Sequence, residues 1–278
     1  MKNKSSFAGL MLLLASMMWG GSYAVQNIMS EHIGSFFIVF LKTFSGYLMI
    51  IYCLLRKKKF NKEVIIGGVL VGLSTGAGLI FQQFGLLTSS VSNVSFISAL
   101  YIMFVPLFRL FEKKKPKNKF WIAVFVACVG LYLLCMNGSF TIAIGDIFTL
   151  IAAALFGLQI ICIDKYAPHV DTTVLCGIEQ AVTSTICLII MLFTEDVSIV
   201  SLKEIVLPTI YLMFIAGFTA SLLQNRYQCY IDPTVASLLM SLEAVFGALG
   251  GVLILGDVMS VREIIGCGLL FFAITIAD

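Results

Sequence analysis

Long apolar stretches separated by short polar connections fill nearly the whole of this 278-residue chain. A helix needs about 20 apolar residues to cross the hydrocarbon core of a bilayer, which is roughly 30 Å thick. Ten stretches of about this length predict ten membrane-spanning helices and leave no room for a separate soluble domain. We expect them at about residues 7–29, 34–55, 64–87, 91–111, 120–137, 144–164, 172–193, 205–225, 234–254 and 260–277.

The connections alternate between basic segments and segments almost free of Lys and Arg. Basic clusters occupy residues 56–62 and 113–119, whereas only Lys203 and Arg262 fall in the alternate set of connections. Cytoplasmic loops of membrane proteins carry an excess of Lys and Arg. The asymmetry therefore predicts that the N-terminus and the C-terminus both lie in the cytoplasm.

Composition agrees with a membrane protein. Hydrophobic residues make up 60% of the chain and charged residues only 12%, whereas soluble domains carry about 25% charge. The net charge of +3 comes from the short loops, where Lys and Arg set orientation, so we expect no nucleic-acid partner. The eight cysteines are scattered without C-x-x-C spacing, and neither a metal site nor disulfides are expected.

The two ends of the sequence were checked for a signal peptide and for a basic tail. Lys2 and Lys4 before an apolar run resemble the start of a signal peptide. The run at 7–29 is long enough to span a membrane and shows no small-x-small cleavage site, so we interpret it as a retained first helix. Because the sequence stops at Asp278 without a basic tail, we expect it to be truncated.

Polar residues mark the starts of several expected helices. Asp146 is placed as an N-cap of the sixth helix, and Pro233 follows Asp232 in a first-turn position of the ninth. Ser260 and Glu263 have the spacing of a capping box at the start of the tenth helix.

The two halves of the chain resemble each other weakly. One match pairs Trp19 with Phe156, and another pairs Gln82 with Gln224. The matched segments are 12–26 with 149–163, and 80–104 with 222–246.

Helix number gives the repeat its orientation. Five helices per half is an odd number, so the second half must enter the membrane from the opposite side. We therefore predict an all-α integral membrane protein of two inverted five-helix repeats, at 1–139 and 140–278, around a central cavity. Inverted repeats are typical of alternating-access transporters, whose substrate site lies near the bilayer midplane.

Three charged side chains lie deep inside expected helices. Charged groups at membrane depth are costly and usually functional. Lys42, Glu179 and Glu243 lie at similar depths, so Lys42 could face either carboxylate. One hypothesis is a substrate clamp, in which Lys42 binds an anionic group and Glu243 binds a cation or carries a proton. The alternative is a structural ion pair that joins helices.

Uncharged polar and aromatic side chains recur at similar depths. Trp19 and Tyr23 are one helical turn apart and share a face. Amides at repeat-related depths suit a cavity that hydrogen-bonds a polar metabolite, although interhelical hydrogen bonds and plain packing are the alternatives. With the three charged residues, the candidate substrate-binding set adds Trp19, Tyr23, Gln82, Tyr101, Gln159 and Gln224.

Catalytic signatures are absent from the sequence. The only histidines, His32 and His169, lie in opposite connections, and no glycine-rich phosphate loop with its Lys occurs. We expect no enzyme activity, no catalytic residue, no cofactor and no metal.

Three segments resemble the drug/metabolite transporter superfamily, in its EamA branch. Residues 241–273 resemble the signature at the end of each repeat, with Ser-Leu-Glu, a long apolar helix, Gly-Asp, a capping box and Ile-Gly. Residues 89–108 resemble the matching element of the first repeat, and residues 17–25 resemble the Trp-Gly opening of the first helix. The resemblance covers essentially the whole chain. It implies a ten-helix inverted-repeat permease for small molecules, often an exporter of amino acids or related metabolites.

The chain departs from the family pattern at the candidate site. Glu243 falls on the family's glutamate position, but Ala244 and Ile102 stand where the family commonly has Pro. Because Pro kinks helices and frees backbone groups, its loss weakens the case for breaks at the site in the fourth and ninth helices. Lys42 stands where the family often has Arg, which keeps a cation without a planar fork.

Together these features predict a multi-pass transporter of small polar or amphipathic metabolites in a bacterial inner membrane. Its expected partners are the lipid bilayer and the small-molecule substrate. Proton or ion coupling is left open, as is the choice between a monomer and a homodimer. The alternatives are a nucleotide-sugar or lipid-linked carrier transporter of the same superfamily, and a non-transporting membrane scaffold.

Overall fold

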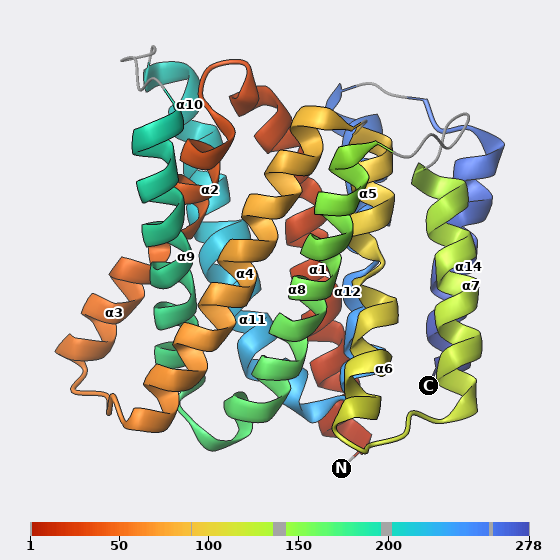
Figure 1. The fold of residues 1–278 in the computed structure, drawn as a ribbon, viewed down its shortest axis with the longest axis horizontal. Coiled ribbons are helices and arrows are strands. Elements are labelled where there is room, and N and C mark those ends of the chain that lie inside the picture. Colours follow the sequence, from red (N-terminus) through yellow and green to blue (C-terminus); the bar gives the residue numbers. More distant parts are fainter. Residues whose placement is uncertain (1, 90, 136–142, 196–201, 256–257, 278) are drawn as a thin grey trace.

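The fold is a bundle of helices that run along a common direction (Figure 1). The computed structural model describes residues 2–89, 91–135, 143–195, 202–255 and 258–277, and regular secondary structure within these ranges is entirely helical. The expectation of an all-α membrane protein is confirmed by this architecture.

The helices of the first half are α1 (Lys2–Ser30), α2 (Ser35–Thr43), α3 (Ser45–Leu55), α4 (Lys62–Thr88), α5 (Val91–Ala99), α6 (Tyr101–Phe111) and α7 (Asn118–Cys135). The second half begins with α8 (Ile144–Tyr166), η1 (Ala167–His169), α9 (Thr172–Thr194), α10 (Leu202–Ile210) and the π-helical η2 (Tyr211–Thr219). It continues with α11 (Ala220–Tyr227), η3 (Gln228–Tyr230), α12 (Pro233–Met240), α13 (Glu243–Gly250), η4 (Gly251–Leu255) and α14 (Val261–Ala277).

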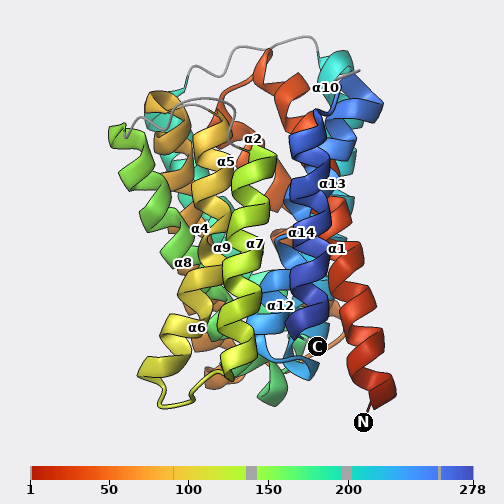
Figure 2. The same cartoon turned by 90° about the vertical axis from the view of Figure 1, so that its right-hand side faces the viewer.

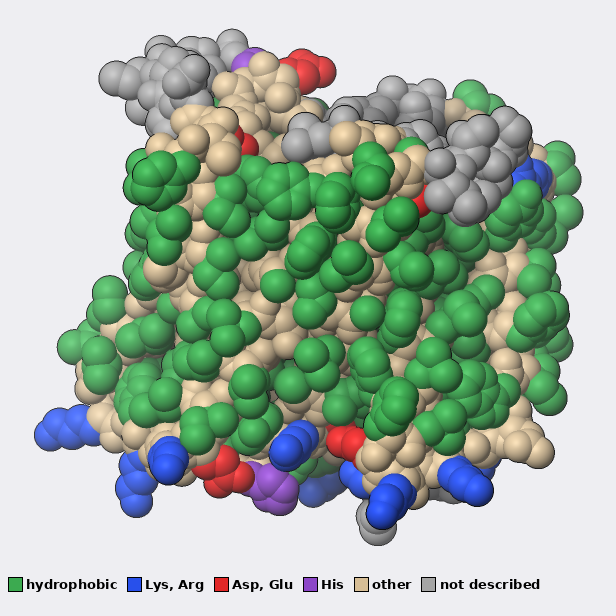
Figure 3. All heavy atoms as spheres, viewed as in Figure 1, with side chains coloured by type: hydrophobic (Ala, Val, Ile, Leu, Met, Phe, Trp, Pro, Cys, Tyr) green, Lys and Arg blue, Asp and Glu red, His purple; other side chains and the backbone are tan. Residues whose placement is uncertain are grey.

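Nine stretches of the described residues are long and apolar enough to cross a membrane. They correspond to the first nine expected spans, and the tenth is α14, which has 17 residues. Figure 3 shows a broad hydrophobic belt across the middle of the molecule, with most of the visible Lys and Arg side chains at its lower rim. Such a belt is the surface that a bilayer would cover.

The two halves begin at opposite ends of the bundle. Helix α1 starts at the lower end in Figure 1, whereas α8 starts at the upper end. Helices α7 and α14 lie side by side (Figure 2). Gly130 and Gly266 meet there, and a Cβ built on Gly266 would lie 2.6 Å from the Gly130 carbonyl oxygen. This approach needs glycine on both helices.

Side chains from both halves share the largest core cluster. Ile102 of α6, Leu131 of α7, Ile160 of α8, Leu238 of α12 and Leu270 of α14 are each at most 1% exposed. The cluster therefore packs α12, the helix that precedes Glu243 in the chain, against helices of the first half.

Three spans that the sequence predicted as continuous helices are interrupted. The second is split at Phe44, the fourth at Leu100, and the ninth between Met240 and Glu243. The argument that the absence of Pro favours unbroken fourth and ninth helices was therefore wrong. Tyr101 and Glu243 are the first residues after their respective breaks.

Local hydrogen bonds account for the break before Glu243 without a proline. The Ser237 and Ser241 hydroxyls donate to carbonyl oxygens three residues earlier, each at 2.8 Å. Such side-chain bonds to the preceding turn compete with the backbone pattern and bend helices. The Leu242 N–H then donates to the Leu239 carbonyl in a tighter turn, which marks the break.

Two of the three expected helix starts have the predicted geometry. Asp232 caps α12, because its carboxylate accepts a hydrogen bond from the Thr234 N–H at 2.9 Å. At α14 the Glu263 carboxylate accepts from the Ser260 N–H at 2.6 Å. Asp146 was placed incorrectly as an N-cap. Helix α8 begins two residues earlier, and Asp146 reaches back to accept from the Ala143 N–H at 2.8 Å.

Candidate functional site

A cavity of about 160 Å³ lies inside the bundle and is lined by side chains from both halves. Eight of the nine residues predicted for substrate binding line it: Trp19, Lys42, Gln82, Tyr101, Gln159, Glu179, Gln224 and Glu243. The ninth, Tyr23, has a side chain that lies outside the described part of the structure. The structure thus brings the eight together around one space, and their role in binding remains a prediction.

The rest of the lining was not part of the predicted substrate-binding set, although Gln83 and Gln180 are amides at the same expected depth. The additional residues are Ser22, Gln26, Thr43, Thr75, Leu79, Gln83, Ser98, Phe156, Ile160, Gln180, Ser221 and Met240. The repeat register carried a signal for several of them. Phe156 is the counterpart of Trp19, and the same register pairs Ser22 with Gln159.

Lys42 is held at the cavity by the close packing of α2 against η2. A Cβ built on Gly217 of η2 would lie only 1.9 Å from the Lys42 carbonyl oxygen, so the two backbones touch. The Lys42 ammonium interacts electrostatically with Glu243. An ammonium group carries three N–H donors and no acceptor, so Lys42 suits an anionic group in the cavity.

Glu243 opens α13 directly after the break in the ninth span, and its side chain is half-buried. Helix α1 packs closely at this point, because a Cβ on Gly20 would lie 2.6 Å from the Glu243 carbonyl oxygen. Of the two carboxylates that depth alone allowed, Glu243 is the one coupled electrostatically to Lys42. The cavity thus contains a cation and a carboxylate contributed by opposite halves.

Glu179 has different surroundings, because its carboxylate is only 1% exposed and is surrounded by neutral donors. It accepts hydrogen bonds from the Thr75 hydroxyl at 3.1 Å, the Gln159 amide at 3.3 Å and the Asn225 amide at 2.7 Å. These donors come from α4, α8 and α11. Glu179 therefore joins four helices at the cavity wall, a role that the sequence did not predict.

A series of amides continues from Glu179 along the wall. Gln159 and Gln224 exchange hydrogen bonds at 3.2 and 3.3 Å, and Gln224 also donates to Gln228 at 3.0 Å. Gln228 in turn donates to the Ile160 carbonyl at 2.7 Å. We call these residues, Glu179, Gln159, Gln224 and Gln228, the Glu179 network. Buried amides of this kind are stable only when their polar atoms are paired.

Aromatic side chains form another part of the lining. The Trp19 indole N–H donates to the Ala216 carbonyl at 2.9 Å, which fixes the ring against η2. Phe156 and the 6%-exposed Tyr101 also line the cavity. Apolar ring faces beside charged groups suit a ligand that has both an apolar and a polar part.

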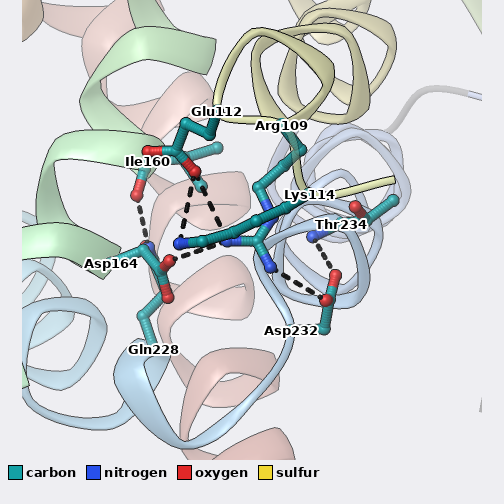
Figure 4. Close-up of polar contacts among 8 residues, drawn as sticks. All are labelled: Arg109, Glu112, Lys114, Ile160, Asp164, Gln228, Asp232 and Thr234. Carbon is teal, nitrogen blue, oxygen red and sulfur yellow. Dashed lines mark hydrogen bonds and ion pairs between the residues drawn. The ribbon is translucent and has the colours of Figure 1, made fainter. Parts of the chain in front are cut away.

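A cluster of charged side chains surrounds Arg109 in the last turn of α6 (Figure 4), at the end of the bundle where α1 begins and α14 ends (Figure 1). The Arg109 guanidinium contacts Asp164 at 3.3 Å, and Asp232 and Glu112 at 3.5 Å each. Lys114 also contacts Glu112 at 3.5 Å. Arg109 belongs to the first half, whereas Asp164 and Asp232 belong to the second, so the cluster fastens the two halves together at this end.

The repeat counterparts of the Arg109 cluster carry no charge. Continuing the register of the matched segments pairs Asp164 with Asn27, Asp232 with Ser90, and Arg109 with Gly251. The ion pairs that join the two halves at one end therefore have no counterpart at the repeat-related positions.

At the opposite end, Glu195 connects α9 to α2. Its carboxylate accepts hydrogen bonds from the Phe36 N–H at 2.7 Å and the Phe37 N–H at 3.0 Å. The N-terminus of α2 is a natural position for a negative charge, because its N–H groups have no partner within the helix.

The described side chains were also searched for metal-binding geometry. Across the described ranges, no group of three or more His, Cys, Asp or Glu residues is placed to hold a metal ion. All eight cysteines are free.

Comparison with known proteins gives the same architecture. The sequence profile of the EamA-like transporter family matches residues 6–136 and again residues 143–277. A protein named "Uncharacterized transporter" from Archaeoglobus fulgidus (strain ATCC 49558 / DSM 4304 / JCM 9628 / NBRC 100126 / VC-16) is 27% identical over 276 residues, covering 99% of this chain and 87% of the relative. A solved structure described as "Crystal structure of protein" superposes with a TM-score of 0.84 at 17% identity, covering 98% of this chain and 96% of that one.

Proposed function

The chain belongs to the EamA-like transporter family, and from that premise we propose that it moves small polar or amphipathic metabolites, such as amino acids, across a membrane by alternating access. The observation that carries the proposal is the cavity, which Lys42 and Glu243 line together with Trp19 and Phe156. A cation, a carboxylate and ring faces around one small space match the parts of an amphipathic metabolite.

Size and charge favour this cargo over the larger carriers of the superfamily. Pockets for drug-sized ligands measure roughly 300–1,000 Å³, well above the 160 Å³ found here. A phosphate group is usually held by several cations, and Lys42 is the only Lys or Arg that lines this cavity in the described structure. Both features argue against a nucleotide sugar. The charged and amide side chains that line the cavity also argue against a non-transporting scaffold.

We further propose the orientation and direction of transport. The basic segments at 56–62 and 113–119 belong to the end where α1 begins, so that end faces the cytoplasm of a bacterial cell. The division into repeats at 1–139 and 140–278 accords with the two stretches matched by the family profile. Export is the proposed direction, with the substrate site alternately open to each side.

Counterflow in proteoliposomes tests the function. Vesicles loaded with each of the twenty amino acids should take up the same labelled compound for at least one of them. Glu243→Gln should lower that uptake about 10-fold or more, because the negative charge that it removes belongs to the lining of the binding cavity. Glu63→Gln, which removes an exposed carboxylate in the first turn of α4, should leave uptake unchanged. Uptake that survives Glu243→Gln intact would remove Glu243 from the mechanism, and absence of uptake for every amino acid would refute this cargo class.

A further inference from the structure

We propose that the part of the cavity wall formed by the Glu179 network is a subsite for the protonated amine of the cargo, and that Glu179 determines this specificity through the amides in front of it. The inference rests on the proposed function, because it names the group by which a transported metabolite is recognised. It follows from how donors and acceptors are arranged along the wall.

Both ends of the network are acceptors, and this fixes the orientation of every amide between them. The Glu179 carboxyl oxygens accept hydrogen bonds, so the NH₂ of Gln159 faces them. At the other end, the Ile160 carbonyl requires the NH₂ of Gln228 to face it. The Gln228 oxygen is thereby turned towards Gln224, which must donate to it.

The N–H donors of the two lining amides are consequently all in use. Gln159 donates to Glu179 and to Gln224, and Gln224 donates to Gln159 and to Gln228. Each NH₂ group has only two N–H bonds, whereas each carbonyl oxygen has two lone pairs. What these side chains can still offer a ligand is therefore acceptor capacity alone.

Two further acceptors beside the network lack a donor. The Oε1 atom of Gln180, which lines the cavity, and the Oδ1 atom of Asn225 are buried without a hydrogen-bond partner in the described structure. Both side chains are at most 3% exposed. Unpaired buried acceptors are costly, and a ligand that brings an N–H donor into the cavity would satisfy the Gln180 oxygen, which belongs to its lining.

The charged residues that line the cavity also favour an ammonium group. Lys42 is the cation, whereas Glu179 and Glu243 are carboxylates, which leaves an excess of acidic groups among the ionisable lining residues. The lining residues of the first half include N–H donors. Lys42 carries an ammonium group, and the Gln82 amide donates to the Ser98 hydroxyl at 2.8 Å. A cargo with an ammonium group towards the Glu179 network and an anionic or polar group towards Lys42 meets complementary partners at both positions.

The test compares the best-transported amino acid with its deamino analogue, the same carbon skeleton with hydrogen in place of the amine. Their apparent affinities are measured by competition in counterflow. Wild-type protein should prefer the amine-bearing compound by about 10- to 100-fold, the range expected for hydrogen bonds to a charged group. Glu179→Gln should bring the ratio within about 3-fold, because an amide at this position lets the neighbouring amides turn their donors to the cavity. Affinity for the deamino analogue should change little.

A variant that loses only the preference for the amine-bearing compound has lost specificity. A structurally damaged protein would instead bind both compounds poorly. If Glu179→Gln does not fold, as judged by size-exclusion profile, Gln180→Met carries the test and should lower the ratio several-fold. Glu63→Gln is the matched control and should leave it unchanged. A wild-type ratio near one, or a ratio that Glu179→Gln or Gln180→Met leaves intact, overturns the inference while transport itself stands. Absence of transport of any amino acid refutes the proposed cargo class, and the inference falls with it.

Discussion

Replacing Arg109 should loosen the end of the bundle at which the termini lie. Arg109→Gln keeps a polar side chain of similar length but leaves Asp164, Asp232 and Glu112 without their shared cation. The Arg109 side chain is 15% exposed, and its partners are 21% to 35% exposed. The cost therefore lies between that of an exposed pair, about 0–1 kcal/mol, and that of a buried one, about 2–5 kcal/mol.

We take about 1–3 kcal/mol as the working magnitude, which corresponds to a shift of about 5- to 150-fold in the opening equilibrium of this end. Amide hydrogen exchange reports that equilibrium directly, since local opening governs exchange in a stable protein. Segments 160–166 and 228–236, which carry Asp164 and Asp232, should exchange faster in Arg109→Gln by this factor. Segments at the opposite end should change little.

Lys114→Gln is the matched control. Lys114 contacts only Glu112 of the same cluster, and its side chain is 59% exposed, so the ion pair should contribute almost nothing. Exchange rates that are equal in Arg109→Gln and Lys114→Gln would refute the idea that Arg109 fastens the two halves together. So would an increase spread evenly over the whole chain, because that is the signature of general destabilisation.

Two further predictions concern packing and pH. Gly217→Ala places a Cβ against the Lys42 carbonyl and should lower stability by about 1–3 kcal/mol in thermal unfolding, whereas Gly268→Ala, with nothing within 4 Å, should not lower it. Burial acts to raise the pKa of Asp171, but hydrogen bonds from Lys58 and from backbone N–H groups outweigh it and hold the pKa below its ordinary value of 3.8. A lowered pKa stabilises the fold above about pH 4 and loses that effect as the pH falls through the folded-state pKa. Asp171→Asn should therefore unfold more easily at neutral pH, and the difference should narrow only below about pH 4. A gap that closes near pH 6 would contradict this assignment.

The sequence predicted the convergence of Lys42, Glu179 and Glu243 because helical rise converts position in a span into depth. Depth does not fix the direction in which a side chain points around the helix. The sequence therefore left both carboxylates open as partners of Lys42, and the structure couples Lys42 to Glu243. The repeat register added Gln82 and Gln224 for the same reason, since symmetry-related positions face the same central space.

Other features depended on information that no local pattern contains. The break before Glu243 arises from serine hydroxyls that bond back to the helix, and the rule that looks for proline missed it. Asp164 and Asp232 are 55 and 123 positions from Arg109, so their meeting is a consequence of the tertiary fold. Glu179 was correctly expected at the cavity, but the three neutral donors that enclose it come from helices far apart in the sequence.

The central claim is that cargo binds in the cavity between the halves, and Trp19 tests it most directly. The chain has two tryptophans, so Trp121→Phe leaves Trp19, which lines the cavity, as the only indole. In this variant, acrylamide should quench Trp19 fluorescence, and a transported amino acid should protect it over the same concentration range that saturates counterflow. Trp19 emission and quenching that do not respond to saturating transported substrate would contradict the claim.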